Sequence, residues 1–342
     1  MSIELRNKII EQFTLDKEQT ISRLAKSTMT DAADVRAVLS QLKKEAIVDK
    51  VGRSGWVLLV PNLKPSNDNP LIPSNVTYID HSGVLSKLRK AYDMGMHALL
   101  IGPAGVGKTA AIQKVAEMAG VPMRTTNFSL RTREHHFIGR LDTKHDGTLY
   151  FKRGPLIESM LEGGIWYGDE INTAESDCLV RLDSALDHRR NVEAEGEFYQ
   201  AAENFWAVSS INPLDRYHPG TKELPGQLLS RYEIKIHVSY PEPQIEYTII
   251  KEHVPKVAEY STTMMDVLDT FHRLRDSAEL PYHPTIRESI TVAKLLVAGL
   301  TPVQALTMSF VDVYTQWGVS TARQVEEFIQ SRMADVMFQN RR

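Results

Sequence analysis

The stretch that decides the fold is Gly102-Pro103-Ala104-Gly105-Val106-Gly107-Lys108-Thr109. It fits the phosphate-binding pattern G-x-x-x-x-G-K-[ST], the P-loop, at every fixed position. The glycines allow the backbone to turn tightly and to aim its N–H groups at a phosphate. Lys108 can then reach the β- and γ-phosphates, and the hydroxyl of Thr109 can ligate Mg²⁺. The stretch therefore predicts a site for ATP and Mg²⁺.

The residues on both sides of the loop are of the kind that a P-loop needs. The apolar run 98–101 predicts a buried strand that enters the loop. The run 109–119 predicts a helix that leaves it, with its positive N-terminal end toward the nucleotide. The alternative, a glycine-rich turn that binds nothing, explains neither flanking element. We therefore expect residues 102–109, together with Ala110 in the first turn of this helix, to hold the nucleotide.

A second apolar run, 165–167, is followed by Gly168 and then by two acidic residues. Downstream of a P-loop, Asp169 can hold the Mg²⁺ water shell opposite Thr109. Glu170 can polarise a water molecule for attack on the γ-phosphate. Without the P-loop, solvated acids at an ordinary strand end would be the better interpretation. Gly168 is unusual, because the residue before the acids is normally bulky and apolar, so we expect another group to approach closely there.

Three further polar residues are candidates for the same site. Asn212 ends a predicted strand and could orient the attacking water or sense the γ-phosphate, although an asparagine that begins a turn is the alternative. Arg231 precedes the last predicted strand and is either a surface residue or one that reaches the phosphate of a neighbouring subunit. Arg287 lies near the start of a helix, where its charge opposes the helix dipole, so it indicates an anionic partner; a solvated arginine is the simple alternative.

Residues 1–60 predict a small separate domain. Apolar residues at helical spacing predict three helices, and the runs 47–51 and 56–60 predict a hairpin. Three helices and a hairpin resemble a winged helix, whose third helix enters the major groove in DNA-binding members. The 10 Lys and Arg residues of this stretch only slightly outnumber its 8 Asp and Glu residues, whereas a dedicated DNA binder is usually more basic. DNA binding and a docking or assembly role both stay open.

Residues 61–75 hold four prolines and four asparagines and predict a stiff linker. An extended arm packed on the next domain is the alternative. We expect an α/β P-loop core over residues 76–240 and a mostly helical region over residues 241–342.

Composition narrows the class of protein but not its partners. The net charge of −3 favours neither nucleic acid nor membrane. The single cysteine, Cys178, excludes an intrachain disulfide and suits a reducing compartment. The N-terminus lacks the apolar core of a signal peptide, and no run is long enough to span a membrane, so a cytoplasmic location is expected. His135 and His136 are adjacent but have no partner at ligand spacing, so we expect no metal there.

Taken together, these stretches resemble the AAA+ ATPases, and within them the CbbQ/NorQ-like proteins of the MoxR group. The similarity covers about residues 76–300, with 102–109 as Walker A and 165–170 as Walker B. Other stretches similar to that group are Gly154-Pro155-Leu156, Glu162-Gly163-Gly164, Asp187-His188-Arg189-Arg190, Ile211-Asn212-Pro213 and His218-Pro219-Gly220. Gly168 and the N-terminal unit depart from the usual pattern of the group.

The resemblance implies an α/β fold, in which a P-loop domain with a parallel sheet is followed by a helical lid. It also implies assembly into a ring, expected to be a hexamer. It makes Asn212 sensor 1, Arg231 an arginine finger that acts across a subunit boundary, and Arg287 sensor 2. Predicted hairpins at 142–152 and 191–200 look like the helix-2 insertion and the hairpin before sensor 1, which would face the pore or the substrate.

For function, the resemblance implies that ATP hydrolysis remodels or activates a protein partner. Such relatives often work with a partner that bears a von Willebrand factor A domain. A DNA-associated motor that grips nucleic acid through residues 1–60 is the alternative. A third hypothesis is a scaffold that assembles when it binds nucleotide and does not hydrolyse ATP.

Overall fold

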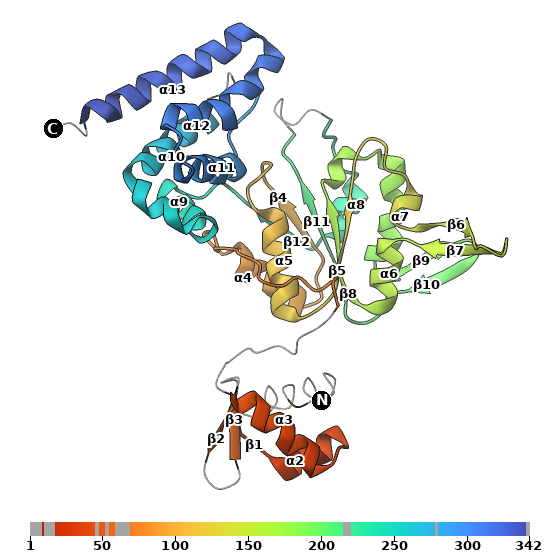
Figure 1. Ribbon diagram of the computed structural model, residues 1–342. Coiled ribbons are helices and arrows are strands. Elements are labelled where there is room, and N and C mark those ends of the chain that lie inside the picture. Colours follow the sequence, from red (N-terminus) through yellow and green to blue (C-terminus); the bar gives the residue numbers. More distant parts are fainter. Residues whose placement is uncertain are drawn as a thin grey trace. The chain divides into compact units, whose positions relative to one another are not determined.

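The structure is a computed structural model that describes residues 9, 18–44, 48–51, 55–58, 69–214, 220–277 and 280–339 (Figure 1). The chain divides into two compact units, residues 1–72 and 73–342.

The first unit combines two helices with a three-stranded antiparallel sheet in the order β1-β3-β2. Its elements are β1 (Glu18–Thr20), α2 (Ile21–Thr28), α3 (Ala32–Lys44), β2 (Val48–Val51) and β3 (Gly55–Leu58). Its core contains Ile9, Leu24, Val35, Val38, Leu39, Leu42 and Trp56. The predicted second and third helices and the hairpin are present, whereas the predicted first helix lies outside the described residues except for Ile9. The short strand β1 was not predicted, because three residues carry no readable alternation.

The second unit is built on a five-stranded parallel sheet in the order β12-β4-β11-β8-β5. The strands are β4 (Ala98–Ile101), β5 (Met123–Asn127), β8 (Gly164–Asp169), β11 (Phe205–Ile211) and β12 (Ile234–His237). Strands β8 and β11 are apolar along most of their length because they are buried on both faces. Since β11 lies between β4 and β8, the P-loop, the acid pair and Asn212 all follow the carboxyl ends of adjacent strands.

Helices cover both faces of this sheet (Figure 1). On one face, α4 (Val84–Asp93) and α5 (Lys108–Ala119) pack against sheet residues that include Leu100 and Val208. On the other face, α6 (Pro155–Glu162), α7 (Ser176–Leu186) and α8 (Gly226–Arg231) pack against Leu99 and Ala207. The alternation of neighbouring strand residues between the two cores is the period of two that a pleated strand imposes. Short 3-10 turns, η1 (Glu134–His136) and η2 (Ile171–Thr173), follow β5 and β8.

Two antiparallel hairpins project beside α6 and α7, where the sequence predicts them (Figure 1). The first pairs β6 (Gly139–Thr143) with β7 (Leu149–Arg153), and the second pairs β9 (Asn191–Ala194) with β10 (Glu197–Gln200). The hairpins contact each other through the rings of Phe151 and Tyr199, whose centroids lie 5.8 Å apart.

The rest of the chain is helical and has a core of its own. Its elements are α9 (Pro243–His253), η3 (Pro255–Tyr260), α10 (Ser261–Arg275), α11 (Ile286–Val297), α12 (Pro302–Ser309), η4 (Val311–Trp317) and α13 (Val319–Gln339). Among the residues that the structure describes, no helix is both long and apolar enough to cross a membrane.

Candidate functional site

A cavity of about 330 Å³ opens over the P-loop. Residues 104–110 line it, together with both acids at the end of β8, residues 77–79 and His81 before α4, and Arg287 of α11. Gly105 and Gly107 have positive φ values of 69° and 97°, a conformation that glycine adopts without strain. Gly102 and Pro103 begin the loop and accept hydrogen bonds from Lys108 with their carbonyl oxygens, but they are not among the described residues that line the cavity. The cavity therefore brings together most of the residues that the sequence predicts for nucleotide binding.

The Lys108 ammonium has an acceptor for each of its three protons. It donates to the carbonyl oxygens of Gly102 and Pro103 over 2.5 and 2.9 Å, and to the Oδ1 atom of Asn212 over 2.8 Å. Burial lowers the pKa of Lys108 to about 8, although the nearby carboxylates of Asp169 and Glu170 oppose this shift. An anion in the cavity would meet a lysine that is already oriented.

Asn212 links this lysine to the predicted base. Its side chain is almost fully buried, and its Nδ2 group donates to the Oε1 atom of Glu170 over 2.9 Å. One amide therefore contacts Lys108 with its oxygen and Glu170 with its nitrogen. Glu170 itself has a φ of 54°, which puts a non-glycine residue in the left-handed region directly after β8.

Asn172 holds the backbone of Asn212 in place, a role that was not predicted from the sequence. Its Nδ2 group donates to the backbone oxygen of Asn212 over 2.8 Å, and its Oδ1 atom accepts from the backbone N–H of Asn212 over 3.3 Å. Asn172 is 1% exposed and lies in η2. An asparagine two residues after the acid pair was the only available signal.

The two predicted Mg²⁺ ligands are joined by a third side chain, Tyr167. Its hydroxyl donates to the Oδ1 atom of Asp169 over 2.5 Å and lies 3.3 Å from the hydroxyl oxygen of Thr109. The same Oδ1 atom accepts from Ser210 over 2.6 Å. Burial, with the Asp169 carboxylate adding to it, raises the pKa of Tyr167, so the hydroxyl stays protonated. Tyr167 and Ser210 were also missed, because they look like ordinary strand residues.

Thr109 and Asp169 suit Mg²⁺ chemically. Carboxylate and hydroxyl oxygens are the hard ligands that this ion prefers, and it usually takes few protein ligands beside phosphate oxygens and water. In the described part of the chain, no group of three or more His, Cys, Asp or Glu side chains is arranged to hold a metal. A Mg²⁺ ion that arrives with a nucleotide fits this oxygen pair.

Gly168 lies where another group approaches closely, as its position predicts. A Cβ atom there would come within 2.7 Å of the Ser209 hydroxyl oxygen and 2.8 Å of the Ile171 side chain. Ser209 in turn forms a 2.7 Å hydrogen bond with the hydroxyl of Tyr232, the residue after Arg231. The glycine thus leaves room for the hydrogen bond between Ser209 and Tyr232.

Arg231 lies apart from the cavity of its own chain. It is the last residue of α8, and its Nε atom lies 3.7 Å from the Oδ1 atom of Asp183 on α7. It is not among the described residues that line the cavity.

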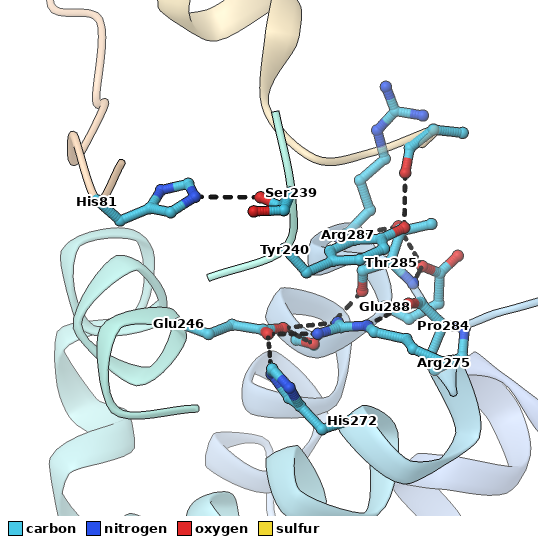
Figure 2. Close-up of polar contacts among 12 residues, drawn as sticks. His81, Ser239, Tyr240, Glu246, His272, Arg275, Pro284, Thr285, Arg287 and Glu288 are labelled. Atoms are coloured by element: carbon cyan, nitrogen blue, oxygen red, sulfur yellow. Dashed lines mark hydrogen bonds and ion pairs between the residues drawn. The ribbon is translucent and has the colours of Figure 1, made fainter. Parts of the chain in front are cut away.

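Arg287, in contrast, lines the cavity from the first turn of α11 (Figure 2). Thr285 caps this helix by accepting from the backbone N–H of Arg287 over 3.1 Å, and Glu288 completes the capping box through the backbone N–H of Thr285. The cap fixes the start of the helix and so the position of Arg287, which lines the cavity together with both acids. The motif His218-Pro219-Gly220 lies, except for Gly220, outside the described residues.

Comparisons with known proteins identify the kind of domain to which the P-loop belongs. Residues 97–232 match the family model of the AAA domain of the dynein-related subfamily. An uncharacterized protein of Staphylococcus aureus (strain USA300) is 32% identical over 177 residues, which cover 50% of this chain and 66% of that protein. The chain thus spans slightly less than two thirds of the length of the curated relatives that it matches.

Two solved structures have more distant similarity. NtrX from Brucella abortus in complex with ADP is 18% identical, with a TM-score of 0.46 and coverage of 80% of this chain and 58% of that chain. A RuvB mutant from Thermotoga maritima is 16% identical, with a TM-score of 0.44 and coverage of 68% and 71%. The match of residues 97–232 to the family model, on a parallel sheet whose P-loop and acid pair share one cavity, shows that these residues form an AAA+ domain.

Proposed function

We propose that this protein is a MoxR-type AAA+ ATPase that forms a ring, expected to be a hexamer, and uses ATP hydrolysis to remodel or activate a protein partner. The observation that carries the ATPase part is the continuous set of contacts from Lys108 through Asn212 to Glu170, beside the pair of Thr109 and Asp169. Each of these residue types has a defined task in phosphoryl transfer.

In this mechanism Lys108 exchanges the Asn212 oxygen for phosphate oxygens when ATP binds. The Asn212 amide is then free to orient a water molecule, and Glu170 accepts a proton from that water as it attacks the γ-phosphate. The bond from the γ-phosphorus to the bridging oxygen breaks, and ADP leaves with that oxygen. Thr109 and Asp169 would hold Mg²⁺, and the bound ion would neutralise charge on the phosphate oxygens. Arg287 contacts the phosphates from the helical region.

Arg231 is proposed to act on the nucleotide of a neighbouring subunit. Its distance from the cavity of its own chain and its position at the end of α8 support this role. An arginine supplied in trans is worth about 10³–10⁵ in rate in well-studied phosphoryl-transfer systems.

The two hairpins support a protein partner rather than a nucleic acid. Large apolar side chains are exposed on them: Leu141 at 51%, Leu149 at 67% and Phe198 at 71%. Exposed apolar groups of this size favour contact with a protein chain, whereas nucleic acid is held mainly by basic groups on phosphates. We include in this proposal a second partner, a protein that bears a von Willebrand factor A domain.

The test is the ATPase rate per subunit as a function of protein concentration, for the wild type and for Arg231→Ala, with the mass of the assembly measured in parallel. We expect a rate that rises with concentration as rings form, and that falls at least about a hundredfold in the variant without loss of the assembly. Lys222→Ala, which removes a half-buried lysine that pairs with Glu175, is a control that should keep the rate. A wild-type protein that binds ATP and assembles without turnover would instead support the scaffold.

The same assay separates the two kinds of partner. Stimulation by duplex DNA, with an affinity that falls steeply with salt, would favour the DNA-associated motor that uses residues 1–60. Stimulation by a protein partner, with indifference to DNA, is the expected result.

A further inference from the structure

Polar contacts outside the predicted phosphate site join the P-loop to the interior of the helical region (Figure 2). Tyr240 lies in the segment that connects β12 to α9. Its hydroxyl donates to the carbonyl oxygen of Ala104 in the P-loop over 2.8 Å. The guanidinium of Arg275, at the end of α10, lies 4.1 Å from the centre of the Tyr240 ring, a close cation–π distance. Tyr240 therefore contacts the loop with its hydroxyl and the helical region with its ring.

Arg275 in turn binds two further segments of the helical region. It forms a bidentate ion pair with Glu246 of α9, with N–O distances of 2.6 and 2.9 Å. Its Nε atom donates to the carbonyl oxygen of Pro284 over 2.7 Å. Pro284 directly precedes Thr285, so Arg275 ties the start of α11 to α9 and to the Tyr240 ring.

Glu246 is fully buried and uses both oxygens. Besides Arg275, it accepts from the Ser289 hydroxyl over 2.6 Å and lies 3.2 Å from the Nε2 atom of His272. Burial acts to raise the pKa of Glu246, but hydrogen bonds from Arg275 and His272 outweigh it and lower the pKa to about 2. The ion pair of Glu246 and Arg275 is therefore charged at neutral pH. Its two parallel hydrogen bonds leave the Arg275 guanidinium little freedom to move.

The helical region touches the P-loop a second time at the next residue. A Cβ atom on Gly105 would lie 2.5 Å from the Cβ atom of Thr285, so the cap of α11 rests directly on the loop. Arg287, two residues on, lines the cavity. The Ala104 and Gly105 contacts together set the distance between the loop and the first turn of α11.

The connecting segment is also held from the other side. The Nε2 atom of His81, which lines the cavity, lies 3.1 Å from the carbonyl oxygen of Ser239. Burial raises the pKa of Tyr240 to about 12, so its hydroxyl stays a donor at neutral pH. Tyr240 itself is not among the described residues that line the cavity.

We propose that Tyr240 is a positioning residue of the nucleotide site: through Arg275 it holds the start of α11 against the P-loop, so that Arg287 reaches the phosphates. The proposal rests on the proposed function, because Arg287 needs a bound nucleotide to meet. Tyr240 acts through Arg287, by way of its hydrogen bond to the loop, rather than on the phosphates directly.

The decisive variant is Tyr240→Phe, which keeps the ring on Arg275 and removes only the hydroxyl that reaches Ala104. Titration of the full chain with a fluorescent, non-hydrolysable ATP analogue and Mg²⁺ measures the dissociation constant. We expect it to rise by about 5- to 10-fold, the worth of one such hydrogen bond. Tyr314→Phe is the matched control, since it also removes a hydroxyl bonded to a backbone oxygen, that of Tyr282, inside the helical region. It should leave the dissociation constant within about twofold.

A double-mutant cycle with Arg287→Ala tests the positioning itself. If Tyr240 acts through Arg287, the effect of Tyr240→Phe shrinks to less than about twofold when Arg287 is absent. A merely structural role would weaken binding by the same factor in both backgrounds, and this result overturns the inference. So does a Tyr240→Phe protein that binds like the wild type, or one that is weakened no more than Tyr314→Phe. Failure of the wild type to bind any nucleotide would instead overturn the proposed function on which the inference rests.

Discussion

The Oδ1 atom of Asn212 accepts a 2.8 Å hydrogen bond from the ammonium of Lys108. The other end of the same amide donates to Glu170, so the phosphate-binding lysine and the predicted base are connected through one side chain. Phosphate oxygens would compete with Asn212 for Lys108, and binding of ATP would thus change the partners of Asn212 and Glu170 together. The first two predictions below follow from this connection.

Glu170→Gln should keep nucleotide binding and abolish turnover. Glutamine retains an oxygen that can accept from Asn212 but cannot accept a proton from water, and loss of a general base costs about 10²–10⁴ in rate. Steady-state ATPase assays and analogue titration measure the two effects separately. Glu203→Gln, which changes an exposed carboxylate, is the control and should behave as the wild type. Normal turnover of Glu170→Gln would rule out the assigned role.

Asn172→Ala should lower kcat more than it changes KM. The variant removes both hydrogen bonds that fix the backbone of Asn212, and each buried backbone group left without a partner costs about 1–3 kcal/mol. Urea unfolding reports the stability, and single-turnover hydrolysis reports the chemical step. An unchanged rate in a protein that is destabilised by this amount would show that Asn172 serves only the fold.

Tyr167→Phe should raise the Mg²⁺ concentration that is needed for tight binding of the ATP analogue. Its hydroxyl holds Asp169 and lies beside Thr109, so its loss leaves the two ligands less well placed, with an expected shift of about 3- to 10-fold. Titrating Mg²⁺ at fixed analogue concentration measures the shift. Tyr314→Phe serves again as the control, and an unchanged or lower Mg²⁺ requirement in Tyr167→Phe would contradict the role.

Gly168→Ala should destabilise the protein by about 1–3 kcal/mol through overpacking. The added methyl group would lie 2.7 Å from the Ser209 hydroxyl oxygen and 2.8 Å from the Ile171 side chain. Urea unfolding of the variant gives the change in free energy. Gly226→Ala is the matched control, because a Cβ atom there meets nothing within 4 Å. Equal stability of the two variants would mean that β8 and β11 adjust without cost.

Acid should weaken the helical region through Glu246. Its pKa is lowered to about 2 from a usual value of 4.5, so the ionised form stabilises the fold. This contribution is fully present above about pH 4.5 and is lost as the pH falls toward 2, by linkage. The free energy of unfolding of the wild type and of Glu246→Gln, measured between pH 3 and 7, should converge toward low pH. A constant difference between the two proteins over this range would contradict the assignment.

Much of the fold follows from local sequence. The run 98–101, the glycines of the P-loop and the helix after it form one continuous stretch, so neighbouring residues alone indicate a strand, a turn and a helix. The strands that end at Asp169 and at Ile211 contain apolar runs that are long enough to be predicted from the sequence. The family model and the parallel sheet bear out the AAA+ fold that these motifs predict.

The sequence by itself therefore determined the phosphate-binding loop, the acid pair and the α/β class, because these depend on residue type and on spacing over a few positions. Only the tertiary structure decided that Tyr167 joins Thr109 to Asp169, that Asn172 holds Asn212, and that Tyr240 reaches Ala104. Apart from the hydrogen bond between Tyr167 and Asp169, these contacts link residues that are distant along the chain. They exist because the sheet places β11 between β4 and β8 and because the segment after β12 returns past the P-loop. The spacing of apolar residues within a single segment cannot predict which segments become neighbours in space.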